Sequence, residues 1–194
     1  MFFSVLSFIR TENFLYADKK GFYSSFLEIV TSKMISRGVF YLSTIEQRLQ
    51  ELGLQLPEAT PPLYHYVPLT IHQKVAYISG QVPRINGDIP YPGKVGEDVT
   101  IEQAAELAEF CVLKGLSCLK AQIGSLDQVE QILKVTGYVQ VAPDFYEPSK
   151  VLDAASALLE KIFGEKGRHA RTAVGVATLP SNTPVEIDFI IGIK

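Results

Sequence analysis

The sequence of 194 residues predicts an α+β fold, in which one mixed β-sheet carries two helices packed on one face. Three observations lead to this class. The predicted elements follow the order ββαβαββ, without the strict alternation of a doubly wound fold. Two helical segments are amphipathic and bounded by capping or stop residues. The last two strands alternate in polarity, which leaves the sheet one apolar face for helices to cover.

The first helix of the domain is expected to begin near Ser43. Ser43 to Glu46 has the S-x-x-E spacing of a capping box, and Gly53 provides a stop. An apolar face lies between them, formed by Ile45, Leu49 and Leu52. We therefore expect the domain to occupy residues 43–194, with residues 1–42 as an N-terminal extension.

The extension has a different composition from the rest of the chain. It opens with nine mostly apolar residues that end at Arg10, too short a run to span a bilayer and without the leading charge of a secretory signal. Residues 21–42 form a loosely helical pattern. Three interpretations remain open: a segment that folds onto the domain, one that lies on a membrane surface, or a start site assigned too far upstream.

The remaining elements are expected in a regular order. Two short strands, about 66–71 and 74–79, are joined by a tight turn at His72-Gln73 and followed by a long loop rich in Gly and Pro. Thr100 caps a helix with Gln103 in the capping-box position, and Gly124 ends it. A strand then covers about 129–141, a second helix 149–163, and the final strands 171–178 and 184–193.

Composition argues against several classes of function. A net charge of −3 and a pI near 5.7 provide no basic field for phosphates, so we expect no nucleic-acid partner. Cys111 and Cys118 lie seven apart in one helix, roughly 10 Å along its axis, and are expected to be reduced, packed thiols. This is typical of a cytoplasmic protein. The three histidines show no zinc-binding spacing, and we expect no metal.

Arginine 171 stands out at the mouth of the penultimate strand. Period-two alternation places Arg171, Ala173 and Gly175 on one face of that strand and Thr172, Val174 and Val176 on the other. We expect Arg171 to share the polar sheet face with Glu186 and Asp188 of the last strand. Two readings follow: a surface ion pair with one of these carboxylates, or a bidentate grip on the carboxylate of a ligand.

These motifs together resemble the Rid/YjgF family of reactive-intermediate deaminases. The resemblance rests on "SGQVP" at 79–83, "VTGYV" followed by "PDF", and the final pair "ARTAVGVATLP" and "VEIDFII". It runs from about Ile45 to the carboxyl end and is closest to a bacterial Rid-like subgroup. It implies a chorismate-mutase-like fold and a homotrimer with ligand pockets between subunits. It also implies hydrolysis of enamines and imines to 2-oxo acids and ammonia, without cofactor or metal.

The resemblance also implies a set of site residues. The carboxylate-binding arginine of the family corresponds to Arg171, and its acidic residue on the last strand corresponds to Glu186, which would position the attacking water. Tyr66, thirteen positions before the serine of "SGQ", and Gly80 would line the substrate pocket, although Tyr66 could equally be a packing residue. The resemblance implies an imino acid or 2-oxo acid as the small-molecule partner. Some members of the family suggest a third function, nucleic-acid cleavage or translation inhibition, but the acidic pI argues against it. We therefore expect neither a nucleic-acid nor a membrane partner.

The chain departs from the family at one pocket position. Many active members read "ARSC" where this chain reads "ARTA", so Ala173 replaces the pocket cysteine and His169 replaces the proline ahead of the motif. We expect His169 and Arg168 to be solvated rim residues. The alternative function is therefore a non-catalytic trimeric module that binds a small carboxylate or a protein.

Overall fold

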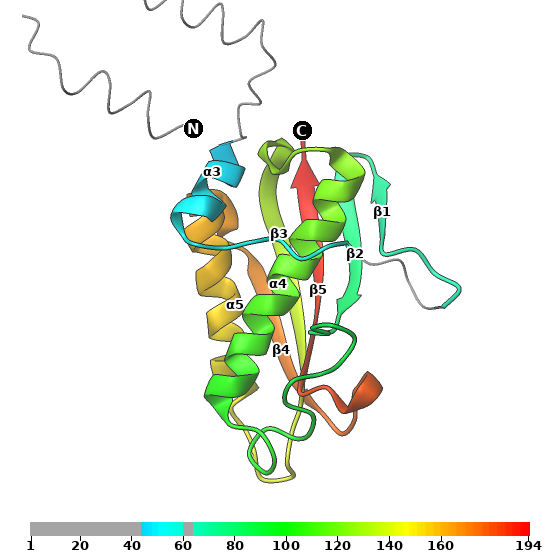
Figure 1. Ribbon diagram of the computed structural model, residues 1–194, viewed down its shortest axis with the longest axis vertical. Helices are drawn as coiled ribbons and strands as arrows, with labels where there is room; N and C mark the ends of the chain where they lie inside the picture. The colour runs from blue at the N-terminus through cyan, green and yellow to red at the C-terminus, as the bar shows by residue number, and fades with distance from the viewer. Residues whose placement is uncertain (1–43, 60–63) are drawn as a thin grey trace, which may run out of the picture. The chain divides into compact units, whose positions relative to one another are not determined.

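A computed structural model describes residues 44–59 and 64–194. It confirms the α+β class: one five-stranded mixed sheet has α4 and α5 side by side on one face, with the short helix α3 at one end of α5 (Figure 1). The elements are α3 (Thr44–Glu51), β1 (Leu69–His72), β2 (Val75–Gln81), α4 (Ile101–Ile123), β3 (Val129–Gln140), α5 (Pro148–Phe163), β4 (Ala170–Val176) and β5 (Val185–Ile193). The predictions for residues 1–43, including the cap at Ser43 and the domain boundary there, lie outside the described residues.

The strands lie in the order β1-β2-β5-β3-β4. All neighbouring pairs are antiparallel except β3 and β4, which are parallel and joined by the crossover helix α5. The predicted order ββαβαββ is thus confirmed. It places β1 with β2 at one edge of the sheet and β4 at the other.

Helix α4 forms as its sequence predicts. Thr100 accepts from the Gln103 backbone N–H while the Gln103 side chain accepts from the Thr100 N–H, and Gly124 ends the helix at a φ of 82°. Its apolar side packs on the sheet so closely that a Cβ built at Gly115 would overlap the ring of Phe189 on β5. Helix α4 is therefore fixed against the strands that carry the site.

Helix α3 is capped across the fold. The carboxylate of Asp127 accepts hydrogen bonds from the backbone N–H groups of Thr44 and Ile45, at 2.9 and 3.0 Å. A carboxylate at this end of a helix satisfies two free donors and matches the helix dipole. The short turn after α4 therefore holds α3 in place.

The turn between β1 and β2 lies one residue later than predicted. Gln73 and Lys74 occupy its two central positions, with φ values of 46° and 64°. Positive φ at both positions gives a hairpin turn whose twist matches that of the strands. Tyr66 consequently lies before β1 rather than within it.

The predicted face of Arg171 is wrong. Arg171 is in register with Val135 of β3, and Val135 with Phe189 of β5, so Arg171 lies on the helix-covered face. Glu186 is in register with Tyr138, and Tyr138 with Val174, on the opposite, open face. Val174 and Val176 looked like core residues from their polarity, but β4 is an edge strand and its valines face away from the helices.

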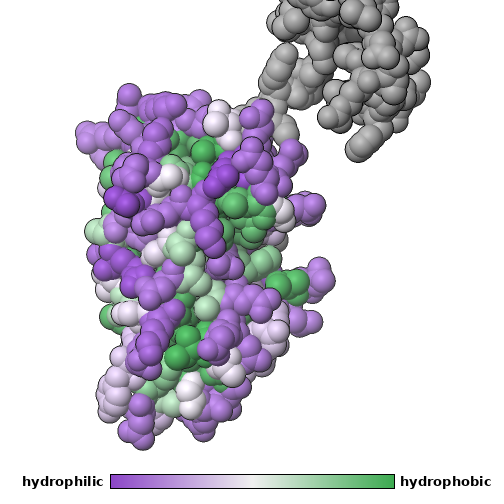
Figure 2. Space-filling model, turned by 90° about the vertical axis from the view of Figure 1, so that its left-hand side faces the viewer, coloured by the Kyte–Doolittle hydropathy of each residue, from purple (hydrophilic) through white to green (hydrophobic). Residues whose placement is uncertain are grey.

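Both cysteines are free and buried within α4, as predicted. None of the helices within residues 44–59 and 64–194 combines the length and the apolar character needed to cross a bilayer. The side of the molecule on which α5 lies in Figure 1 is mostly hydrophilic, with small apolar patches between the polar side chains (Figure 2).

Candidate functional site

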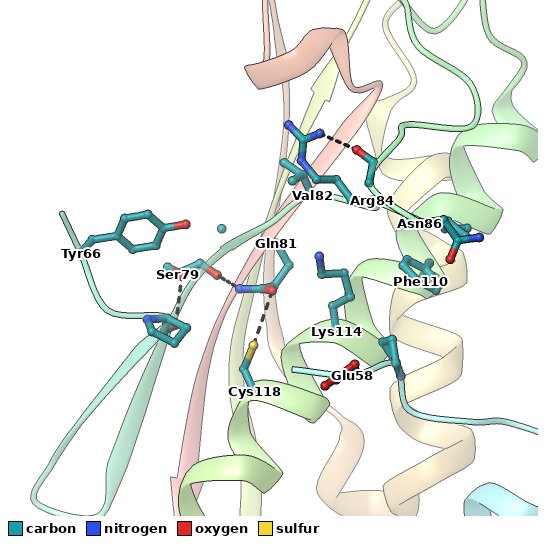
Figure 3. A pocket seen from close by; sticks show the side chains of 15 residues that line it. Glu58, Tyr66, Ser79, Gln81, Val82, Arg84, Asn86, Phe110, Lys114 and Cys118 are labelled. Carbon is teal, nitrogen blue, oxygen red and sulfur yellow. Dashed lines mark hydrogen bonds between the residues drawn. The ribbon is translucent and has the colours of Figure 1, made fainter. Parts of the chain in front are cut away.

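A pocket of about 760 Å³ opens between β2, the loop after it and α4 (Figure 3). Two of the residues predicted for the site line it, Tyr66 and Gly80. Its other lining residues are Pro57, Glu58, Pro68, Ser79, Gln81, Val82, Arg84, Ile85, Asn86, Gly87, Phe110, Lys114 and Cys118. Tyr66 is half exposed, and in Figure 3 its hydroxyl end points toward Ser79.

Gly80 lies directly against Glu186. A Cβ built at Gly80 would overlap the Glu186 carboxylate, so only glycine lets this side chain approach β2 as it does. The structure therefore brings together three of the predicted residues around one stretch of β2, with Tyr66 and Gly80 lining the pocket and Glu186 against the backbone of Gly80.

The surroundings of the Glu186 carboxyl favour its protonated form. Burial raises its pKa above the ordinary value, and the negative charge of Asp188 raises it further. Asp188 in turn accepts a hydrogen bond of 3.1 Å from the Tyr138 hydroxyl. A raised pKa makes the ionised carboxylate a stronger base than an ordinary one, which suits it to accept and return a proton.

Arg171 lies on the edge strand β4, away from the pocket, and pairs with neither Glu186 nor Asp188. Its Nη1 donates to the Asp153 carboxylate of α5 at 2.8 Å and to the Ser156 hydroxyl at 3.1 Å. Within the described part of the chain, its Nε and Nη2 have no hydrogen-bond partner. One full edge of the guanidinium therefore remains available for a carboxylate.

His169 contacts Ser156, the residue whose hydroxyl also accepts from Arg171. Its Nδ1 lies 2.6 Å from the carbonyl oxygen of Gly167, and its Nε2 lies 3.0 Å from the Ser156 hydroxyl. Because a carbonyl can only accept, Nδ1 is the donor to Gly167, and Nε2 pairs with the Ser156 hydroxyl. The predicted rim role fits Arg168, which is exposed and pairs with Glu160 and Glu165, but His169 is partly buried and hydrogen bonded.

Ala173 lies two residues beyond Arg171 on the same face of β4, packed at the margin of the core. The predicted residues thus form two groups within one chain. Tyr66, Gly80 and Glu186 gather at β2, whereas Arg171 and Ala173 lie on β4, with β5 and β3 between the two strands.

Lys114 belongs to the pocket and was missed by the sequence reasoning. It extends from α4 into the pocket, half-buried, near Gln81 and Phe110 (Figure 3). The signal was present, because Lys114 sits within the apolar stripe of a helix, between Cys111 and Cys118. A lysine in such a stripe is either covering its own stem or reaching a cavity.

The described residues contain no group of three or more His, Cys, Asp or Glu side chains that could hold a metal ion. The candidate site residues are thus arginine and lysine side chains, carboxyls and backbone groups, all carried by one α+β domain. A family model described as "YjgF/chorismate_mutase-like, putative endoribonuclease" matches residues 46–190. The chain belongs to this YjgF family, which confirms the resemblance read from its motifs.

Relatives of known sequence or structure agree. Protein TCP17 of Trypanosoma cruzi is 36% identical over 148 residues, covering 76% of this chain and 92% of that protein. The crystal structure of Atu1372 from Agrobacterium tumefaciens, a protein of unknown function, is 44% identical, with a TM-score of 0.72 and coverage of 77% of this chain and 92% of that one. A structure from Shewanella oneidensis, described as a "putative endoribonuclease", is 33% identical, with a TM-score of 0.75 and coverage of 78% and 100%.

Proposed function

We propose that the protein hydrolyses reactive enamines and imines of the 2-aminoacrylate type to 2-oxo acids and ammonia. Arg171 binds the substrate carboxylate and Glu186 positions and deprotonates the attacking water. The observation that carries the proposal is the free Nε and Nη2 edge of Arg171, beside the small side chain of Ala173 at the sheet edge, among the residues that the structure describes.

The proposal places each site between two subunits of a homotrimer. Arg171 lies on the edge strand β4, and Tyr66, Gly80 and Glu186 lie toward the opposite edge, so a cyclic arrangement that brings unlike edges together completes the site. The open face of the sheet supports an assembly, because Tyr77, Leu133 and Val174 expose 47, 40 and 38% of their surface there. Exposed apolar groups on one face are typical of a protein interface.

The chemistry needs only positioned groups and one water. The water oxygen forms a bond to the carbon of the protonated imine as Glu186 takes one water proton, and a neutral carbinolamine results. Glu186 then returns that proton to the nitrogen. The C–N bond breaks as the hydroxyl group gives up its proton and becomes the carbonyl of the 2-oxo acid, and ammonia leaves and takes up the released proton. Fixing the carboxylate beside the water lowers the barrier mainly through proximity and orientation.

Replacement of the family cysteine by Ala173 is compatible with this reaction, because water is the nucleophile. The chain's own thiols do not substitute for it. Burial raises the pKa of both Cys111 and Cys118, and both lie on α4 rather than on β4. The reaction as proposed uses neither a metal nor a cofactor.

Ala173 also favours the second candidate, a non-catalytic module that binds a small carboxylate through Arg171. Turnover distinguishes the two. RNA cleavage, which the family description names, has less support, because the net charge is −3 and the Arg171 cluster faces Asp153 rather than an extended basic surface.

The test follows the decay of 2-iminobutanoate and 2-iminopropanoate, generated in situ by an amino-acid oxidase. We expect the purified protein to accelerate decay and Arg171→Ala to lose at least about 100-fold in kcat/KM, as expected when a positioning contact is lost. Asp153→Asn is the matched control, since it removes the ion pair and leaves the arginine. Equal decay with and without protein would eliminate the enzymatic proposal. Saturable binding of 2-oxobutanoate by such an inactive protein would then favour the binding module.

A further inference from the structure

Lys114 enters the pocket as a cation without a counter-ion. Its side chain is half-buried, and no ion pair or hydrogen bond to its ammonium occurs within residues 44–59 and 64–194. Lys120 and Lys150, by contrast, pair with Glu46 and Glu147. A half-buried ammonium without a partner is costly, so its retention at a pocket wall calls for an explanation.

A second cation faces the same pocket. Arg84 lies in the loop after β2, where its Nη1 donates to the Gly87 carbonyl at 3.0 Å and its Nη2 donates to the Ser181 hydroxyl. These contacts hold the guanidinium in place without neutralising it, because neither acceptor is charged. In Figure 3 the Lys114 ammonium lies between Gln81 and Phe110, on the side of the pocket toward Arg84.

Other groups around Lys114 do not offset this charge. Gln81 is neutral and uses its amide to donate to the Ser79 carbonyl at 2.9 Å. Cys118 lies 3.8 Å from the Gln81 amide oxygen, and burial raises the pKa of both Cys118 and Cys111, which keeps these thiols neutral. Glu58 lines the pocket but forms no ion pair with Lys114 in the described part of the chain.

The electrostatics agree with the geometry. Burial lowers the pKa of Lys114. The thiols of Cys111 and Cys118 act in the opposite direction, and the positive charge of Arg84 makes a smaller contribution that again lowers the pKa. An anion placed beside the ammonium would raise its pKa again, because it stabilises the charged form of the lysine. The pocket should therefore bind a negatively charged ligand more tightly than a neutral one.

We propose that Lys114, with the charge of Arg84 behind it, forms a subsite for a second carboxylate of the ligand. Tyr66 and Gly80 line the same pocket, so this subsite is continuous with the one proposed above for the substrate. The inference rests on that proposed function and names its substrate class: imino acids and 2-oxo acids that carry a carboxylate on the side chain. Arg171 of a neighbouring subunit takes the first carboxylate and Lys114 the second.

The test compares two stable product analogues, 2-oxoglutarate and 2-oxobutanoate, by titration calorimetry on the full chain. We expect 2-oxoglutarate to bind at least about tenfold more tightly, as for a charge-assisted contact. Lys114→Gln should abolish that preference and Lys114→Arg should keep most of it. Lys161→Gln, on an exposed residue outside the pocket, removes the same charge and should keep all of it. If Lys114→Gln folds poorly, the same measurement is made on Lys114→Met, whose side chain is apolar and of similar length.

The pH dependence gives a second readout. The preference should decline as pH rises through the lowered pKa of Lys114, hence below the ordinary lysine value of 10.5. Equal affinity for the two acids in the unmodified protein, or a preference unchanged in Lys114→Gln and Lys114→Met, would overturn the subsite.

The two proposals fail in distinguishable ways. Binding needs no turnover, so a preference for 2-oxoglutarate that depends on Lys114 in a protein that hydrolyses no imine would refute the reaction and keep the subsite. Hydrolysis of 2-iminobutanoate that depends on Arg171, with no preference between the two acids, would keep the reaction and refute the subsite.

Discussion

Arg171 and Glu186 lie on opposite faces of the same β-sheet. Arg171 donates hydrogen bonds to Asp153 and Ser156 of α5 on the helix-covered face. Glu186 lies against Gly80 on the open face. One chain cannot bring these two side chains to one small substrate. A shared site therefore has to use Arg171 from one protomer and Glu186 from another, which makes the proposed function inseparable from the assembly.

The Arg171–Asp153 pair should matter little to stability. Asp153 is largely exposed, and exposed pairs contribute roughly 0–1 kcal/mol. We expect Arg171→Ala to reduce turnover strongly while the unfolding midpoint in urea shifts only slightly. Asp153→Asn should leave turnover intact and lower KM, because Asp153 competes with a ligand carboxylate for the guanidinium. A large loss of stability in Arg171→Ala would show that the residue is structural.

The activity should have an acid limb set by Glu186. As a base this carboxyl works only when ionised, so kcat/KM should fall as pH drops through its raised pKa, with a midpoint above the ordinary value of 4.5. Asp188→Asn removes a negative neighbour and should move the midpoint to lower pH. Tyr138→Phe removes the hydrogen bond to Asp188 but keeps its charge, and should leave the midpoint nearly in place. An unshifted midpoint in Asp188→Asn would contradict this assignment.

Gly80 should be required for activity rather than for folding. An added methyl group would displace the Glu186 carboxylate, which is the flexible end of its side chain, so we expect Gly80→Ala to lower kcat at least about tenfold, as for loss of a positioned base, with little change in thermal stability. Gly192→Ala is the matched control on the same sheet, since its added methyl would meet only ordinary contacts of 3.6 Å or more. Full activity in Gly80→Ala would remove Glu186 from the mechanism.

Asp127 should stabilise the attachment of α3. Asp127→Ala leaves two backbone N–H groups of the first turn without their acceptor, and we expect a loss of about 0.5–2 kcal/mol in the free energy of unfolding, as for other lost helix caps. Denaturant unfolding at fixed protein concentration measures it, and Asp127→Asn, which keeps one carbonyl oxygen, should lose less. An unchanged free energy in Asp127→Ala would show that α3 is held by its packing alone.

Much of the fold could be predicted because its signals are local. The capping box at Thr100 and Gln103, the stop at Gly124 and the alternation of the last two strands each depend on neighbours in the chain. The turn lies at Gln73-Lys74, one residue later than predicted, and its position is not evident from the sequence because neither residue is among those that usually adopt positive φ.

The site was harder to predict because it depends on which face of the sheet the helices cover. Polarity suggested that Val174 and Val176 face the core, but β4 is an edge strand and the helices cover the side that carries Arg171 and Ala173. The Asp153 partner of Arg171 comes from another element, eighteen residues away, which alternation along one strand does not reveal. Lys114 was overlooked for the same reason, since only the packing of α4 beside β2 opens a pocket around it.

The most direct test of the shared site is a subunit-mixing experiment with Arg171→Ala and Glu186→Gln, each inactive alone. Refolding the two together gives mixed trimers, in which one interface unites an intact Arg171 with an intact Glu186. For random mixing in a cyclic trimer, about a quarter of all sites are then intact. The account predicts recovery of imine hydrolysis to roughly that fraction of the unmodified protein's rate, per site. Activity of the mixture no higher than that of the two variants measured separately would contradict it.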